Sequence, residues 1–346
     1  MNNLDEFEEY IKQGEPEQKE KSIIWKTAIG LQDVDGLKPS KYLIETAKSN
    51  IEGDITIEEA NEIIESYYKS DDNRKDIEKR TEEADKVSAR IARILSEKTF
   101  SLSHIEYTNI HKQLFDGIYD FAGKIRDYNI TKAEWVLDGD TVFYASASTL
   151  KETLEYDLQE EKKFSYKNLS EEEVVSHIAK FISNLWQIHI FGEGNTRTTA
   201  VFLIKYLRKL GFKNIENKPF EMNSWYFRNS LVRANYENIQ KNITADDKFL
   251  KMFLSNVIFR KTNELKNREM HIKYTDNVGA KYTDNVGVKE KIVKLIEKNE
   301  SITIKELSST LNVTTRTIER NIKALKDENI IERIGSDKTG YWKIIK

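Results

Sequence analysis

The sequence predicts a mainly α-helical protein with a separate small domain at its C-terminal end. Only three prolines occur in 346 residues, and proline is the residue that most strongly interrupts a helix. Apolar residues recur three and four positions apart through long stretches of the chain, which is the helical period. The composition, 38% apolar and 33% charged, is typical of an ordered domain, and the length allows two or three domains.

The composition also argues against several kinds of chemistry and several cellular locations. The chain has no cysteine, so it forms no disulfide and has neither a thiol nucleophile nor a thiolate metal ligand. No apolar run approaches the ~20 residues that cross a bilayer. The first residues, MNNLDEFEEYIKQ, are acidic, whereas a signal peptide begins with basic and then apolar residues. We therefore expect a cytoplasmic protein with no membrane partner, and secretion by a route without a signal peptide stays open.

Two helices are predicted around the stretch WQIHIFGEGNTRTTAVF. Ser170 followed by Glu173 is a capping-box pattern, and the apolar residues after it share one helical face. That helix should end at about His189. A second helix should begin at Asn195 or the next residue and end at Gly211, because glycine commonly terminates helices. The loop between the two helices therefore leads directly into a helix N-terminus.

One segment, Lys124–Ser146, departs from the helical pattern. It is rich in β-branched and aromatic residues, and its Asp138-Gly139 pair is a common turn of β-hairpins. We expect a small β-hairpin on the helical body.

The polar residues of the central stretch suit a reaction on phosphate. Glu193 can hold Mg²⁺ through oxygen, and the N-terminus of the following helix attracts anions. Gly192 and Gly194 allow the backbone to approach a phosphate, and Arg197 offers a fork of donors. His189 beside them can accept a proton from a hydroxyl. The combination favours nucleotidyl or phosphoryl transfer, and the alternative is an interhelical turn with satisfied polar caps.

Residues 288–346 have the pattern of a DNA-binding module. They contain 13 Lys and Arg against 9 Asp and Glu, a net charge of +4, whereas the whole chain carries −3, so nucleic-acid affinity should lie here. A helix, a short helix at Ile304–Leu311, a turn at Asn312-Val313, a third helix from Thr314 and a two-stranded tail resemble a winged helix-turn-helix. The resemblance implies that the third helix enters the DNA major groove through Thr315, Arg316, Arg320 and Lys323. The alternative is a module for protein contacts or dimerisation.

The sequence HIFGEGNTR, residues 189–197, resembles the signature loop of Fic-domain proteins, and the similarity extends over about Asp85–Leu265. The resemblance implies a protein adenylyltransferase. Such an enzyme moves AMP from Mg²⁺-bound ATP to a Ser, Thr or Tyr hydroxyl of a target protein, or of itself, and releases pyrophosphate. His189 would be the base and Glu193 the Mg²⁺ ligand. The residues placed at the nucleotide are Phe191, Gly192, Gly194, Asn195, Thr196 and Arg197, and Phe191 would also anchor the loop in the core. Tyr226 follows the motif helix by one loop and would line the adenine side, with core packing as the alternative.

The resemblance also assigns the predicted hairpin, as a flap that aligns the target by β-strand addition. The flap residues are Thr131, Lys132, Trp135, Val142, Phe143 and Tyr144. Three residues depart from the family pattern. Ile190 replaces a common proline, and Thr196 replaces a common glycine or lysine. Ala200 stands where a second arginine usually clamps the γ-phosphate.

Upstream, SNIEGDITIEEANEII, residues 49–64, resembles the inhibitory helix of many Fic proteins. The resemblance implies that Glu52 and Gly53 restrain the nucleotide site. Ala200 removes the usual partner of this glutamate, and a pair between Glu52 and Arg197 stays open. The alternative is that Glu52-Gly53 only ends one helix before Thr56 caps the next.

The predicted organisation has four parts: an N-terminal helical region (1–84) with the inhibitory helix at about 40–66, a Fic domain (85–265), a linker with a repeated KYTDNVG (266–288), and a winged helix-turn-helix (289–346). Two other functions stay open. The chain could be a DNA-binding regulator or toxin–antitoxin autorepressor whose Fic site is a degenerate nucleotide sensor, or an enzyme that removes AMP with a water placed by Glu52. A homodimer also stays open.

Overall fold

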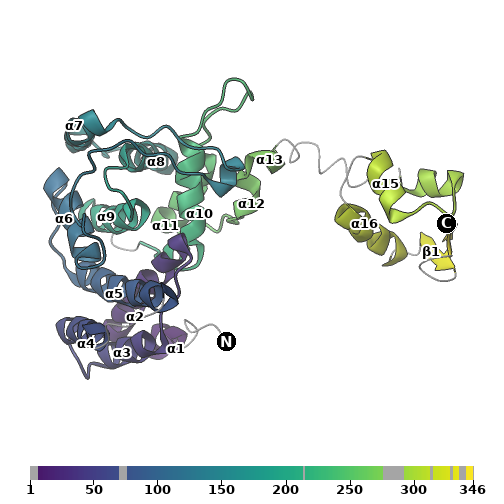
Figure 1. Cartoon of the computed structure of the whole chain (residues 1–346). Coiled ribbons are helices and arrows are strands. Elements are labelled where there is room, and N and C mark those ends of the chain that lie inside the picture. Colours follow the sequence, from purple (N-terminus) through teal and green to yellow (C-terminus); the bar gives the residue numbers. More distant parts are fainter. Residues whose placement is uncertain are drawn as a thin grey trace. The chain divides into compact units, whose positions relative to one another are not determined.

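The computed structural model describes residues 7–69, 76–212, 215–275, 292–311, 315–327, 330–334 and 340–345. The contacts divide the chain into two compact units, Met1–His271 and Ile272–Lys346 (Figure 1). The first unit therefore contains the predicted N-terminal region, the predicted Fic domain and the first residues of the predicted linker. Within the described residues, no helix is long and apolar enough to cross a bilayer.

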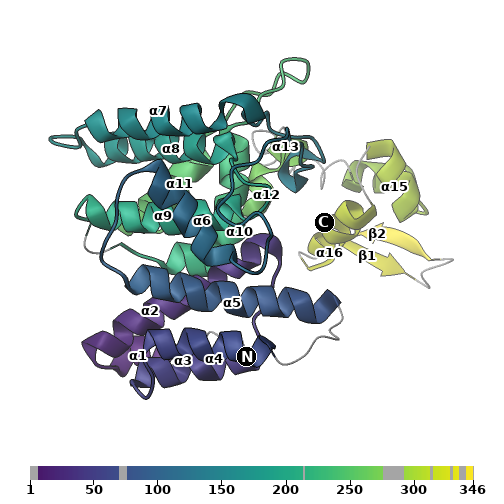
Figure 2. The ribbon, with the colours of Figure 1, turned by 60° about the vertical axis from the view of Figure 1, so that its left-hand side comes forward.

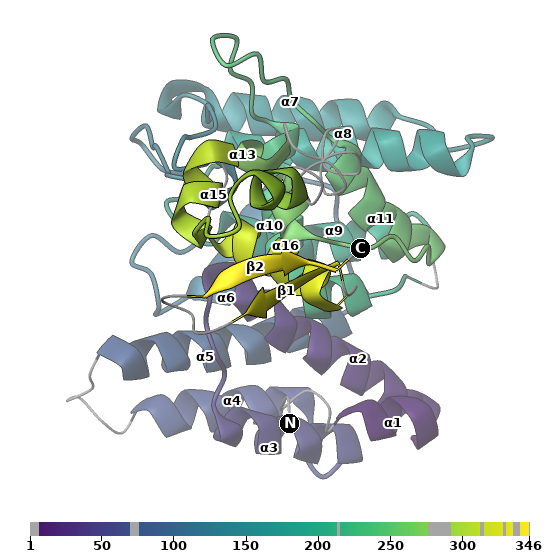
Figure 3. The ribbon, with the colours of Figure 1, turned by 90° about the vertical axis from the view of Figure 1, so that its right-hand side faces the viewer.

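The first unit is built from helices in layers (Figure 2). Their bounds are α1 (Glu8–Gln13), α2 (Pro16–Gly30), the 3-10 helix η2 (Leu31–Asp35), α3 (Lys41–Glu52), α4 (Ile57–Lys69), α5 (Asp76–Ser96), α6 (His104–Phe115), α7 (Leu150–Lys163), α8 (Glu171–Ile188), α9 (Asn195–Lys209), α10 (Lys218–Ala234), α11 (Lys248–Phe259) and α12 (Asn267–Met270). α3 and α4 lie on one side, α2 and α5 come next, α6 and α9 follow, and α7 and α8 lie on the opposite side (Figure 3). The predicted mainly helical fold is confirmed.

The two helices around the central stretch begin and end close to the predicted residues. Ser170 and Glu173 form the expected capping box of α8. His189 ends this helix in the left-handed conformation, with φ 52°. Every residue of α9 from Asn195 to Leu207 is buried, so its first turn is held rigidly by the surrounding helices. The loop between α8 and α9 thus has a fixed position at both ends.

The expected β-hairpin at Lys124–Ser146 is wrong in one respect. The segment does fold back on itself, and Glu134 N–H donates to Asp140 O while Gly139 N–H donates to Glu134 O. Among the described residues of this segment, however, regular structure is limited to the 3-10 helix η3 (Trp135–Leu137). An isolated two-stranded hairpin is marginally stable, and side-chain contacts fix this flap instead.

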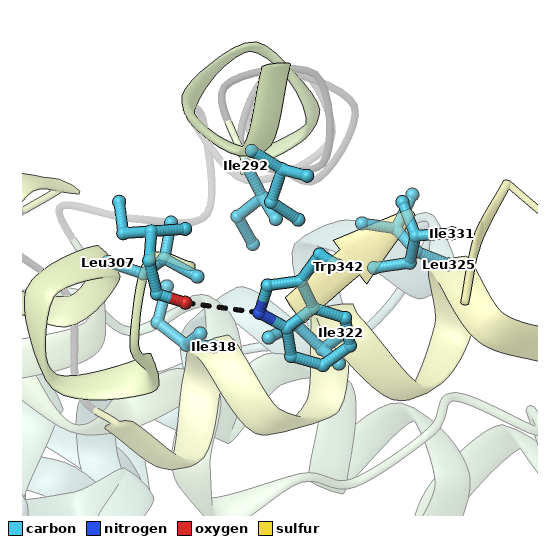
Figure 4. Close-up of a cluster of buried hydrophobic side chains, with 9 residues drawn as sticks. Ile292, Leu307, Ile318, Ile322, Leu325, Ile331 and Trp342 are labelled. Atoms are coloured by element: carbon cyan, nitrogen blue, oxygen red, sulfur yellow. Dashed lines mark hydrogen bonds between the residues drawn. The ribbon is translucent and has the colours of Figure 1, made fainter. Parts of the chain in front are cut away.

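The second unit has the predicted winged helix-turn-helix elements. After α13 (Ile272–Thr275) come helical residues 292–298, α15 (Ile304–Leu311) and α16 (Thr315–Asp327). Strands β1 (Ile331–Ile334) and β2 (Tyr341–Ile344) pair antiparallel. Trp342 packs in the apolar core, and its Nε1–H donates to the Ile302 carbonyl at 3.1 Å (Figure 4). The predicted turn at Asn312-Val313 and most of the KYTDNVG repeat lie outside the described residues.

Candidate active site

His189 is a buried histidine at the end of α8. Its side chain lies beside the rings of Tyr144 and Trp186, with ring centroids 4.3 and 5.3 Å away, and only 4% of the residue is exposed. Neither ring nitrogen has a hydrogen-bond partner among the described residues. Burial, and then the nearby charge of Lys132, hold the pKa of His189 well below its usual range. The imidazole is therefore neutral at pH 7 and can accept a proton.

The loop after His189 leaves a helix N-terminus available to an anion. Gly194 is the N-cap of α9 in the left-handed conformation, with φ 78°, and no side chain caps the helix. The first N–H groups of a helix have no partner within it, so they can bind phosphate oxygens. Asn195 closes the loop with two hydrogen bonds to the Phe191 backbone, of 3.1 and 2.8 Å. Thr196 accepts a hydrogen bond from Trp186 Nε1 at 3.0 Å.

Close packing requires both glycines of the loop. A Cβ atom on Gly194 would lie 2.4 Å from the Phe115 ring, and one on Gly192 would lie 2.7 Å from the Tyr128 hydroxyl. Tyr128 belongs to the flap, so the flap covers the loop closely at this point. Any larger side chain would displace an aromatic ring or the flap.

His111 has no predicted catalytic role, and its side chain holds this loop in place. Its Nδ1 accepts a hydrogen bond from Gly123 N–H at 2.8 Å. Nε2 therefore carries the proton and donates to Glu193 O at 3.0 Å. The ring stacks on Phe191 with centroids 3.6 Å apart. Burial lowers the pKa of His111 to about 4.

We expect His111 to make the first unit acid-sensitive. The folded pKa, about 4, lies below the usual 6.5, so its contribution to stability is full above pH 6.5 and is lost as the pH falls toward 4. Between pH 7.5 and 4.5 this loss should be about 2–3 kcal/mol. Urea unfolding followed by tryptophan fluorescence measures it, with His111→Gln as the comparison. An equal loss of stability in both proteins would contradict the assignment.

Glu193 is the candidate Mg²⁺ ligand, and its carboxylate is 58% exposed. Lys132 Nζ on the flap lies 2.9 Å from one of its oxygens. The described residues contain no group of three or more potential metal ligands. Mg²⁺ is commonly bound by one or two carboxylates together with phosphate and water oxygens. One exposed carboxylate beside an uncapped helix N-terminus fits that mode of binding.

The flap is held at its base by Arg126, a residue that sequence reasoning missed. The Arg126 side chain is buried and donates from Nε to His189 O at 2.7 Å. It also donates to Tyr128 O at 2.5 Å and to Ala145 O at 2.6 Å, which lie near the two ends of the flap. A single guanidinium therefore joins both ends of the flap to the backbone of the candidate base. The motif gives no hint of this role, because the acceptors are all backbone carbonyls.

The predicted flap residues have different surroundings. Tyr144 covers His189 and donates to the buried Glu134 at 3.2 Å, and Arg228 of α10 pairs with the same carboxylate at 2.7 Å. Phe143 is 81% exposed, Thr131 and Trp135 are also exposed, and Val142 is buried. The flap thus presents an aromatic outer surface, while its inner residues close over the site.

Arg197 corrects the expectation about self-inhibition. Its side chain is 1% exposed, its Nη2 donates to Glu83 of α5 at 2.6 Å, and its Nε lies 3.0 Å from a carboxylate oxygen of Asp35 in η2. Glu52 is exposed at the end of α3 and accepts a hydrogen bond from the Tyr10 hydroxyl. The Glu52–Arg197 pair that the sequence left open is therefore not formed. The α3 helix packs on α2, α4 and α5, whereas η2 and α5 contact α9.

The same placement bears on the other predictions for Glu52 and Gly53. Gly53 ends α3 in the left-handed conformation, and Thr56 then caps α4, as the helix-ending alternative predicted. The AMP-removal alternative needs Glu52 beside the nucleotide, but its carboxylate is bonded to Tyr10.

The remaining predicted residues lie apart from this centre. Tyr226, expected at the nucleotide, is 1% exposed and faces Phe253 of α11. In the second unit, Thr315 and Lys323 are exposed on α16, while the side chains of Arg316 and Arg320 lie outside the described ones. The structure thus brings together His189, Glu193, the start of α9 and the flap. The Arg197 side chain instead pairs with Asp35 and Glu83.

These features define a helical domain with a buried histidine and a helix N-terminus without a side-chain cap under a flap. Comparison with known families agrees: residues 100–207 match the Fic/DOC family, and residues 288–341 match an HTH domain. The chain therefore carries a Fic/DOC domain followed by a helix-turn-helix domain. Members of the Fic/DOC family commonly transfer nucleotide monophosphates to proteins.

Two solved structures are similar at low identity. The N-terminal FIC domain of Bep8, a VirB-translocated effector from Bartonella sp. 1-1C, is 20% identical. The match covers 56% of this chain and 92% of that one, with a TM-score of 0.43. A Fic family protein from Desulfovibrio desulfuricans G20 is 13% identical, with 99% and 93% covered and a TM-score of 0.44.

Proposed function

We propose that the first unit is a protein adenylyltransferase that moves AMP from ATP to a Ser, Thr or Tyr hydroxyl of a target protein. The observation that carries the proposal is the neutral, unpartnered His189 beside the uncapped N-terminus of α9. The match to the Fic/DOC family supports the same class of reaction.

In this reaction the hydroxyl oxygen attacks the α-phosphorus, the bond to the bridging oxygen breaks, and pyrophosphate leaves. His189 takes the hydroxyl proton, and its low pKa keeps it ready to do so at neutral pH. Glu193 would hold Mg²⁺, which neutralises charge on the phosphates. The first N–H groups of α9 would bind phosphate oxygens. Lys132 would release Glu193 to Mg²⁺, and the exposed segment at Thr131 would be available to a target chain.

The transfer predicts which part of ATP becomes attached to protein. Full-length protein incubated with a cell lysate and Mg²⁺ should incorporate label from α-labelled ATP and none from γ-labelled ATP. Mass spectrometry of the labelled band should show the mass of AMP on a hydroxyl side chain. Label from the γ position would indicate a kinase instead, and label from neither would contradict the proposal.

The helix-turn-helix domain favours a second function, DNA binding. Thr315 and Lys323 are exposed on α16, the helix that enters the major groove in such modules. We expect the full chain to select duplexes from a random-sequence pool, with affinity that falls as salt is raised. Arg316→Ala with Arg320→Ala should remove this selection, while Lys298→Ala serves as the control. Failure of the full chain to select any duplex would argue for protein contacts, and equal retention by all three proteins would show that Arg316 and Arg320 do not read the DNA.

A further inference from the structure

A cavity of about 820 Å³ lies at the C-terminal ends of α5 and α9, where the first half of α2 and the residues before α10 complete its walls. This volume is within the range of small-molecule sites. α9 has 15 residues, so the cavity is about 20 Å from Gly194 along the helix. It is therefore distinct from the candidate active site, which lies at the other end of the same helix.

The cavity is lined by more cations than carboxylates. The cations are Lys19, Lys98, Lys205, Arg208 and Lys209, and the carboxylates are Glu20 and Glu97. Two of these cations also donate hydrogen bonds to carbonyls at the C-terminal end of α5. Lys205 donates to Ile94 O at 3.0 Å, and Arg208 donates to Leu95 O at 2.6 Å. Lys205 is 3% exposed, and burial lowers its pKa. A nearby anion would relieve this cost of desolvation.

Several cations of the cavity form no ion pair with a described carboxylate, although the charge of Glu20 acts on Arg208. Among the described residues, Lys19, Lys98, Lys209 and Arg208 have no ion pair. Asn217, which is 3% exposed, has its Oδ1 buried without a hydrogen-bond partner. Because this oxygen is not accessible to solvent, it does not contribute to binding in the cavity, and the site depends on its cations.

The cavity also has apolar walls, to which Ile24, Leu95 and Phe100 contribute. These side chains would be in contact with the uncharged part of a ligand. Arginine forms paired hydrogen bonds with phosphate oxygens, and lysine contributes a point charge.

We propose that this cavity binds a small phosphate ester, with its phosphate at Arg208, Lys98 and Lys209 and its organic body against the apolar wall. The site goes beyond the proposed transfer reaction and does not depend on it. AMP is a suitable probe because it combines one phosphate with a planar body, and adenosine is its matched control without the phosphate.

Lysine acylation of the full-length protein, read by mass spectrometry, tests the site at the level of single residues. Saturating AMP should slow the acylation of Lys98 and Lys209 at least threefold, and adenosine should leave it unchanged. Lys151, exposed on α7, is the internal control. The acylation rate of Lys132 reports separately on AMP at the candidate active site. Absence of AMP binding there would therefore not affect the result for the cavity.

Arg208→Gln should raise the AMP concentration needed for half-protection about tenfold, and Lys162→Gln should not change it. Circular dichroism checks the fold, because Arg208 also bonds the end of α5. Lys98 has no hydrogen bond or ion pair with a described residue, and Lys98→Glu should weaken protection of Lys209 in the same way. Equal effects of AMP and adenosine, or slowing that includes Lys151, would overturn the proposal. Equal protection by inorganic phosphate would overturn the role of the organic body.

Discussion

His189→Ala should lower the rate of AMP transfer by about 10²–10⁴-fold, which is the usual contribution of a general base. Its ring is buried beside Tyr144 and Trp186 and has no hydrogen-bond partner among the described residues, so its removal loses two ring contacts but no hydrogen bond. The melting temperature should therefore change little. Initial rates with α-labelled ATP measure the effect, and His104→Ala on α6, a partly exposed histidine, is the matched control.

The pH profile of the wild-type protein adds a second test of the same residue. Burial lowers the pKa of His189, so the imidazole stays neutral below pH 6.5. As the pH is lowered, the transfer rate should therefore begin to decline only below pH 6.5. A rate that halves near pH 6.5, or that is unchanged in His189→Ala, would show that another group accepts the proton.

Local patterns in the sequence were sufficient to predict the helices that position this base. The capping box at Ser170 and the glycine-rich loop define the ends of α8 and α9 through contacts between residues close in sequence. The same holds for α15 and α16 in the second unit. Such contacts depend on few residues, so a pattern of side chains can predict them.

The flap and the surroundings of Arg197 could not be predicted in this way. The flap residues have strand propensity, but the bonds that hold them come from Arg126 and from Arg228 on α10. Arg197 bonds Gln32 and Glu83, which are 165 and 114 positions away. A motif specifies the arginine, while the partner depends on how distant helices pack. The resemblance to a known inhibitory helix therefore identified the wrong carboxylate.

Arg197 leads to the second prediction with a large expected effect. Glu83 and Asp35 neutralise it, Tyr119 OH lies 3.3 Å from its Nη2, and the Phe115 ring lies 4.8 Å from the guanidinium carbon. If Arg197 is to bind ATP phosphates, these carboxylates compete with them. Glu83→Gln should therefore lower the KM for ATP about tenfold, because a hydrogen bond to a charged group contributes about 1.5–3 kcal/mol.

The controls separate competition from a purely structural role of Arg197. Asp35→Asn should act in the same direction but more weakly, because Asp35 is 39% exposed and Glu83 only 18%. Glu52→Gln, which removes a carboxylate bonded to Tyr10, should leave the KM unchanged. A lower melting temperature in Glu83→Gln with an unchanged KM would show that Arg197 joins α9 to α5 and η2 and does not bind ATP. The start of α9 and Glu193 would then hold the phosphates without it.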